Sequence, residues 1–106
     1  MSPAQGFELH PGAAQDIFEI WQFIAEQNLP AARRVREEIL ETIRKLVPFP
    51  HQGHERPDLT PQPLRLQTIR DYLIIYAPDE EPLMVIAVLH GRRNPLIIAA
   101  ILRARR

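Results

Sequence analysis

The chain of 106 residues is 45 % hydrophobic and 25 % charged, a composition typical of one folded domain over residues 1–106 rather than of a disordered segment. It has no cysteine, no basic and apolar leader and no apolar run near the roughly 20 residues that span a bilayer, so we expect a cytoplasmic protein without disulfides, thiolate metal sites or a membrane anchor. Its 13 basic and 13 acidic residues give a formal net charge of zero, although five arginines and no carboxylate follow His90.

The N-terminal segment predicts a short strand and an amphipathic helix. Apolar and polar residues alternate over residues 6–10, which is typical of a strand with one buried face. Pro11 suits the first turn of a helix, where its missing N–H costs nothing. Apolar residues then recur at three- and four-residue steps as far as Ile24, so we expect a helix of about four turns.

A second helix is predicted over residues 31–47. Pro30 disfavours helical geometry at the residue before it, and Asn28 is a favourable capping residue. Pro48 and Pro50 stop the helix at its other end. Two helices with so short a connection favour an antiparallel helical hairpin.

Residues 48–63 predict a surface loop, since they include five prolines and few apolar residues. So long a connection suggests a functional role or a short turn of structure within it. His51 and His54 are spaced i, i+3 in this loop, but they lack partner ligands on a helix, and we expect no metal site.

Three strands follow the loop. Residues 64–68 alternate in polarity, and residues 72–76 form a continuous apolar run. Residues 70–71 would be the tight turn between them, and the proline-bounded, acidic segment 77–82 would be a second turn. Residues 83–89 are rich in β-branched residues and predict the third of these strands.

A C-terminal helix is predicted from Pro95 through Ile101 or Leu102. Helices followed by hairpin-linked strands are typical of an antiparallel sheet packed on helices. The expected fold is therefore α+β, with a helical hairpin packed on a small antiparallel sheet in the order β-α-α-β-β-β, followed by a short C-terminal helix.

The candidate site is basic. Arg65 is expected to point away from the core because it alternates with Leu64 and Leu66, and Arg70 lies at a turn. At the end of the last strand, His90 is followed by a glycine and two arginines. Convergence of these groups on one sheet face would bind phosphates or the carboxylates of a partner helix; a merely solvated basic face is the alternative. The candidate target- or partner-binding residues are Arg65, Arg70, His90, Arg92, Arg93 and Arg103.

The sequence has no glycine-rich phosphate loop, no G-x-S-x-G motif and no Cys–His pair, so we expect no cofactor and no nucleophilic catalysis. The aromatic residues Phe18, Trp21 and Phe23 lie on the first helix. At least Phe18 and Trp21 are expected to pack in the core or within the hairpin.

Several segments together resemble the RelE/ParE toxins of bacterial type II toxin–antitoxin systems, and they are closer to the ParE branch. The first helix carries AQDIFEIWQFIA, the central strand RDYLIIY and the last strand end VLHGRRN, and the matching positions are residues 14–25, 31–32, 51–59, 70–76 and 88–94 with Ile39, Ile43 and Leu46. The resemblance implies a toxin that binds a cognate, ParD-like antitoxin. The antitoxin's acidic C-terminal segment would fold into an apolar groove beside an Arg-rich face.

The resemblance leaves the target open. ParE-like members poison DNA gyrase by binding, whereas RelE-like members cut messenger RNA on the ribosome. A nuclease would use Arg65, Arg92, Arg93 and His90, but residues 94–106 contain no Tyr, His, Lys, Asp or Glu to transfer a proton. Zero net charge also fits a ribosome-binding nuclease poorly. Gyrase inhibition without chemistry of its own is therefore favoured; a non-toxic antitoxin-binding module is the third alternative.

Overall fold

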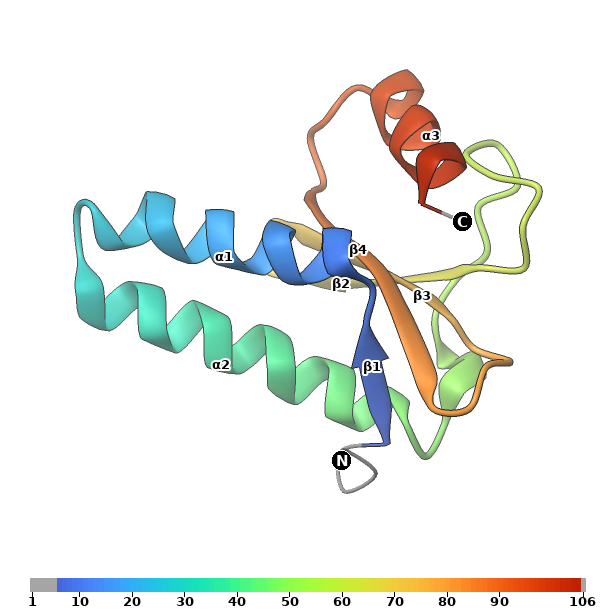
Figure 1. Ribbon diagram of the computed structural model, residues 1–106, viewed down its shortest axis with the longest axis horizontal. Helices are drawn as coiled ribbons and strands as arrows, with labels where there is room; N and C mark the ends of the chain where they lie inside the picture. The colour runs from blue at the N-terminus through green and yellow to red at the C-terminus, as the bar shows by residue number, and fades with distance from the viewer. Residues whose placement is uncertain (1–5, 106) are drawn as a thin grey trace.

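The computed structural model describes residues 6–105, in which a helical hairpin and a third helix flank a four-stranded sheet (Figure 1). The elements are β1 (Phe7–Leu9), α1 (Pro11–Ala25), α2 (Leu29–Leu46), the 3₁₀ turn η2 (Pro50–Gln52), β2 (Arg65–Ile69), β3 (Tyr72–Ala77), β4 (Leu83–His90) and α3 (Pro95–Ala104). The predicted α+β class and element order are confirmed.

The sheet has the strand order β1-β4-β3-β2 and is mixed rather than wholly antiparallel. β2, β3 and β4 pair antiparallel through the two predicted turns, but β1 pairs parallel with β4. The register places Phe7 opposite Leu83 and Leu9 opposite Val85. Alternation over residues 6–10 predicts a half-buried strand without naming its partner, which explains why this parallel pairing was not expected.

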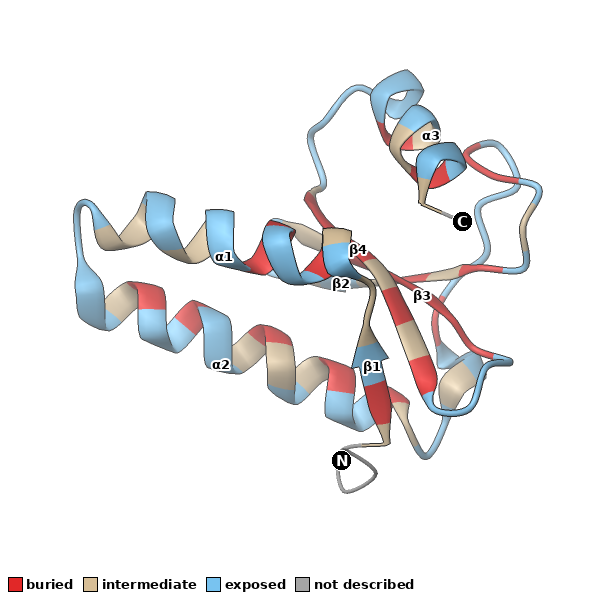
Figure 2. Cartoon of the chain, in the orientation of Figure 1, coloured by how far each residue is buried: buried red, intermediate tan, exposed pale blue. Residues whose placement is uncertain are grey.

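Both faces of the sheet are covered, and a separate apolar core lies on each (Figure 2). The hairpin covers one face, with a core that includes Phe7, Ile17, Ile39, Ile43, Ile74, Tyr76 and Val88. α3 and the long loop cover the other, with Leu59, Leu64, Leu66, Ile75, Leu89, Ile98 and Leu102. The strands β3 and β4 contribute to both cores, which is why they read as continuous apolar runs.

Capping side chains fix where the helices begin. Asn28 Oδ1 accepts from the backbone N–H of Ala31 at 3.0 Å, and Asn94 Oδ1 accepts from that of Leu96 at 2.8 Å. His10 Nδ1 accepts from Gly12 N at 2.9 Å and caps α1 in the same way. α2 begins two residues earlier than predicted because Pro30 occupies its first turn.

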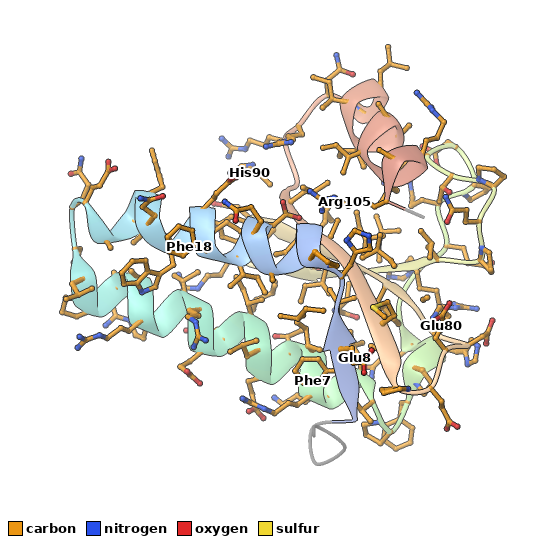
Figure 3. The ribbon with its side chains drawn as sticks, viewed as in Figure 1. Phe7, Glu8, Phe18, Glu80, His90 and Arg105 are labelled. Atoms are coloured by element: carbon orange, nitrogen blue, oxygen red, sulfur yellow. The ribbon has the colours of Figure 1, made fainter. Side chains whose placement is uncertain are left out.

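The C-terminal residues are held by a partly buried ion pair between α3 and α1. Arg105 donates from Nη1 to Asp16 Oδ2 at 2.5 Å and from Nη2 to Oδ1 at 3.0 Å. Asp16 Oδ2 also accepts from the backbone N–H of Val88 at 3.0 Å, beyond the point where β1 stops pairing with β4. Figure 3 shows Arg105 between α3 and the start of α1. The contact replaces a missing strand partner and fastens α3 to the rest of the fold.

The guanidinium group of Arg105 lies directly over Gly12 in the first turn of α1. A Cβ atom at position 12 would collide with the end of the Arg105 side chain, so any residue larger than glycine would require that side chain to shift. Across residues 6–105, no helix is both long and apolar enough to cross a membrane.

Candidate functional site

The predicted basic cluster is divided between the two ends of the sheet. Arg65 pairs with Tyr76, whereas His90 pairs with Tyr72, four residues further back along the same central strand. At about 3.3 Å per residue, these positions are about 13 Å apart along β3 alone. The expected convergence of Arg65 with Arg92 and Arg93 on one face is therefore not found.

Arg65 holds the long loop instead of pointing freely into solvent. Its Nη1 donates to the carbonyl oxygens of His51 at 3.2 Å and Gly53 at 2.8 Å, and its Nη2 lies 3.9 Å from Glu55 Oε2. The side chain is 24 % exposed. The prediction that Arg65 points away from the core was wrong because the sheet has a core on both faces. Arg65 shares the hairpin face with Tyr76, just beyond the end of α2.

The same loop segment is fixed by a buried tyrosine. Tyr76 donates from its hydroxyl to the carbonyl oxygen of Pro50 at 2.7 Å and accepts from the backbone N–H of Gly53 at 3.0 Å. A Cβ atom at Gly53 would lie 2.5 Å from that hydroxyl oxygen. Burial raises the pKa of Tyr76 above its ordinary value of 10.0. Tyr76, Gly53 and Arg65 thus act together to hold the loop, with η2 as the short turn anticipated within it.

Arg70 is neutralised within the protein. Its Nε and Nη2 donate to the two carboxylate oxygens of Glu38 at 2.5 and 3.0 Å, which links the β2–β3 turn to α2. The hydrogen bond from Arg70 lowers the pKa of Glu38 below its ordinary 4.5. Arg70 also has φ = 53°, which is uncommon for a residue with a side chain and marks a tight turn. This bidentate pairing is a structural role, and a binding role for Arg70 is a prediction without support from this geometry.

Three other predicted residues are free to meet a partner: Arg92 and Arg93 after β4, and Arg103 on α3. All three are exposed, and within residues 6–105 none of their guanidinium groups makes an ion pair or hydrogen bond. Exposed aliphatic side chains accompany them on the first turn of α3, where Leu96 is 77 % and Ile97 is 50 % exposed. The arginines and aliphatic groups form a surface of mixed character around the β4–α3 connection.

His90, the last residue of β4, lies beside this surface. Its Nδ1 accepts from the backbone N–H of Arg92 at 3.2 Å, so in the neutral ring the proton lies on Nε2. The ring meets that of Tyr72 edge to face, with centroids 5.6 Å apart. Because Nδ1 is already engaged, the free nitrogen of the neutral ring is a hydrogen-bond donor, which suits binding better than proton abstraction.

A pocket of about 290 Å³ opens between α1 and the ends of β3 and β4 beside His90. Its walls are mostly apolar or aromatic, and its charged lining residues are Asp16, Glu19 and Arg93. Figure 3 shows His90 near the end of β4, between α1 and the chain leading to α3. The residues lining the pocket include Glu19, Ile20, Phe23, Ile24, Tyr72, Leu89, His90 and Arg93.

A second and larger groove, of about 540 Å³, runs between α1 and α2. α1 contributes Ala14, Ile17, Phe18 and Trp21, and α2 contributes Arg33, Arg36 and Leu40, with Leu9 of β1 at one end. The rings of Phe18 and Trp21 stack with centroids 6.3 Å apart. The groove is therefore largely apolar, with guanidinium groups on its α2 side.

Of the two places predicted for Phe18, the core is excluded because the residue is 51 % exposed; Phe18 lies instead on the hairpin, stacked on Trp21. α1 has two apolar stripes: Ala13 and Ile17 face the sheet, while Ala14, Phe18 and Trp21 continue around the helix. The signal was present in the sequence, because apolar residues at positions 14, 18 and 21 widen the stripe beyond what one interface requires. The basic residues beside the groove are also new, since Arg33 and Arg36 were not among the predicted site residues.

The two loop histidines do not join the basic residues described above. His51 Nε2 lies 3.0 Å from Asp79 Oδ1 on the surface, and His54 pairs with Leu66 through its backbone. Within the described residues 6–105, no three His, Asp or Glu side chains gather as metal ligands would.

A family model described as the ParE toxin of the type II toxin–antitoxin system parDE matches residues 7–95. The match begins at the first residue of β1 and ends at the first residue of α3, so it includes the hairpin groove, the whole sheet and the strand end with His90, Arg92 and Arg93. No curated protein is similar enough to the chain to count as a match.

Proposed function

Because the chain belongs to the ParE toxins of type II toxin–antitoxin systems, we propose that it inhibits DNA gyrase by binding and that a cognate, ParD-like antitoxin neutralises it in the cytoplasm. The α1–α2 groove is the observation that carries the antitoxin part of the proposal. Its length along α1, its apolar lining and the guanidinium groups of Arg33 and Arg36 suit an amphipathic helix with acidic residues along one edge.

The proposed antitoxin segment has defined chemistry. Apolar side chains at helical spacing would cover Phe18 and Trp21, and carboxylates one turn apart would meet Arg33 and Arg36. Arg36 is shared with Glu37 of its own helix at 3.3 Å, so Arg33 offers the freer charge. Such a segment is acidic enough to be disordered alone and would fold as it binds.

Inhibition by binding is supported by the division of the basic residues. A phosphodiester-cleaving site needs an acid, a base and phosphate ligands within a few ångströms of one another. Here Arg65 is engaged with loop carbonyls at one end of the sheet, and His90 lies at the other with Nδ1 occupied. A gyrase poison requires no such convergence, because it acts by contact.

Two parallel assays test the proposal. Purified protein is added to a gyrase supercoiling reaction and, separately, to a translating extract in which cleavage of the message is mapped by primer extension. We expect inhibited supercoiling and an intact message. Cleavage of the message at codon positions would identify messenger RNA on the ribosome, rather than gyrase, as the target. An inert protein that still binds an antitoxin tightly would identify a non-toxic binding module.

A further inference from the structure

The β4–α3 connection combines exposed positive charge with exposed aliphatic groups. Arg92 and Arg93 precede α3, and Leu96 and Ile97 form its first turn. Arg103 lies seven residues after Leu96 and so follows it on the same side of the helix. The outer turns of α3 are exposed in Figure 2, while its inner side is buried on the sheet.

This surface adjoins the pocket beside His90, because Arg93 lines both. The pocket volume of about 290 Å³ has room for one large side chain of a partner rather than for a helix. Ile20, Ile24 and Leu89 give it apolar walls, and Phe23, which is 75 % exposed, stands at its rim. A buried apolar anchor surrounded by charged contacts is the common composition of a protein-binding hot spot.

The charge of this surface specifies its partner. The segment from His90 to the C-terminus has five arginines and no carboxylate. A partner that covers it must bring carboxylates for Arg92 and Arg93 and an aliphatic or aromatic side chain for the pocket. A nucleic acid supplies the negative charge but no aliphatic groups for Leu96 and Ile97 and no aliphatic anchor for the pocket.

The surface is distinct from the α1–α2 groove, since the two cavities share no lining residue. α1 separates them: Ile17, Phe18 and Trp21 line the groove, whereas Ile20 and Phe23 line the pocket. Different sides of one helix therefore serve the two cavities. An antitoxin helix in the groove leaves the β4–α3 surface open.

We infer that the β4–α3 surface, composed of Phe23, His90, Arg92, Arg93, Leu96 and Ile97, is the surface that binds the toxin's target, and that its occupant is an acidic protein segment with one apolar anchor residue. The inference rests on the proposed function, because it assigns the target and the antitoxin to separate surfaces. Arg92 and Arg93 bind the carboxylates, His90 donates from Nε2, and the anchor enters the pocket beside Phe23.

A pair of matched charge reversals tests this assignment. Arg92→Glu with Arg93→Glu changes the target surface, and Arg34→Glu with Lys45→Glu makes the same change in charge at exposed positions of α2 that line neither cavity. We expect the first variant to need about 100-fold more protein for half-inhibition of supercoiling, at roughly tenfold for each arginine, and the second to inhibit like the parent. Phe23→Ala should weaken inhibition about tenfold without changing the charge.

Controls separate failure of the surface from failure of the proposed target. Circular dichroism and melting temperature must match the parent for every variant. If the parent inhibits gyrase and the Arg92/Arg93 variant inhibits it equally, the inference is overturned while the proposed function stands. If the parent arrests growth without inhibiting gyrase, and only the Arg92/Arg93 variant loses growth arrest, the surface is supported and the target is corrected.

Direct binding distinguishes the occupant. Fluorescence anisotropy is measured with a labelled 20-nucleotide RNA and a labelled DNA duplex at about 150 mM salt. We expect no saturable binding of either by the parent protein. Binding of one of these probes that is lost in the Arg92/Arg93 variant and kept in the Arg34/Lys45 variant would refute a protein occupant.

Discussion

Removal of the guanidinium group of Arg105 is the sharpest test of how α3 is held. In the parent protein Asp16 is only 8 % exposed, and in Arg105→Ala its carboxylate would keep only the Val88 N–H as a partner. Two charge-assisted hydrogen bonds are lost, together with the bond from Arg105 Nη1 to the Ile86 carbonyl at 3.2 Å. Breaking a buried pair in this way costs about 3 kcal/mol, because one charge is left without compensation.

Thermal and urea denaturation followed by circular dichroism measure this loss. For a domain of this size, about 3 kcal/mol corresponds to a fall in melting temperature of roughly 10–20 °C. Arg103→Ala is the matched control, since it removes an exposed arginine from the last turn of α3, two residues before Arg105, and should change stability by less than about 0.5 kcal/mol. Equal effects of the two substitutions would refute the role of the Arg105–Asp16 pair in stability. Hydrogen exchange adds a local reading, since the Val88 amide should exchange faster in Arg105→Ala than in Arg103→Ala.

Other predictions concern the loop anchor and the turn. Tyr76→Phe leaves the Pro50 carbonyl and the Gly53 N–H without their partner and should cost about 1–3 kcal/mol in urea unfolding at pH 7. Burial raises the pKa of Tyr76 above 10.0, so the stability that the neutral phenol contributes is present below about pH 10 and falls above it. The difference in the free energy of unfolding between the parent and Tyr76→Phe should therefore narrow in alkali. A difference that stays constant with pH would contradict this. Gly53→Ala should cost about 1–3 kcal/mol by the same measurement, because its Cβ would be 2.8 Å from the backbone oxygen of Leu66. If stability is restored in the double variant with Tyr76→Phe, the main clash is with the Tyr76 hydroxyl. Arg70 lowers the pKa of Glu38, so this pair contributes above about pH 4.5 and is lost as the solution becomes more acidic; Glu38→Gln should flatten that part of the stability curve, and an unchanged curve would argue against the pair.

The elements of the fold follow closely from local signals. Prolines and asparagines mark the helix starts, and the apolar runs of β3 and β4 are long enough to be strands buried on both sides. The pairing of β1 could not be predicted, because an alternating strand fits beside any neighbour with the same buried face. The Asp16–Arg105 contact joins residues 89 positions apart and has no local signature.

The site was predictable in part. Two antiparallel turns in succession place Arg65 near the 77–82 turn and His90 near the 70–71 turn, so the predicted topology already separated the two residues. The prediction that Arg65 converges with Arg92 and Arg93 on one face is inconsistent with this register. Arg92 and Arg93 are exposed where they follow the last strand, and within residues 6–105 neither guanidinium group pairs with a carboxylate. The groove between α1 and α2 could be predicted only if the apolar surface of α1 was recognised as wider than the core requires.

The close approach of Arg105 to Gly12 restricts how this sequence can diverge. A side chain at position 12 would push the guanidinium group aside and strain its contact with Asp16. Positions 12, 16 and 105 are therefore expected to vary together, although they lie near opposite ends of the sequence. Among relatives we expect a residue larger than glycine at position 12 to occur together with uncharged residues at positions 16 and 105. Sequence comparison alone can detect this covariation.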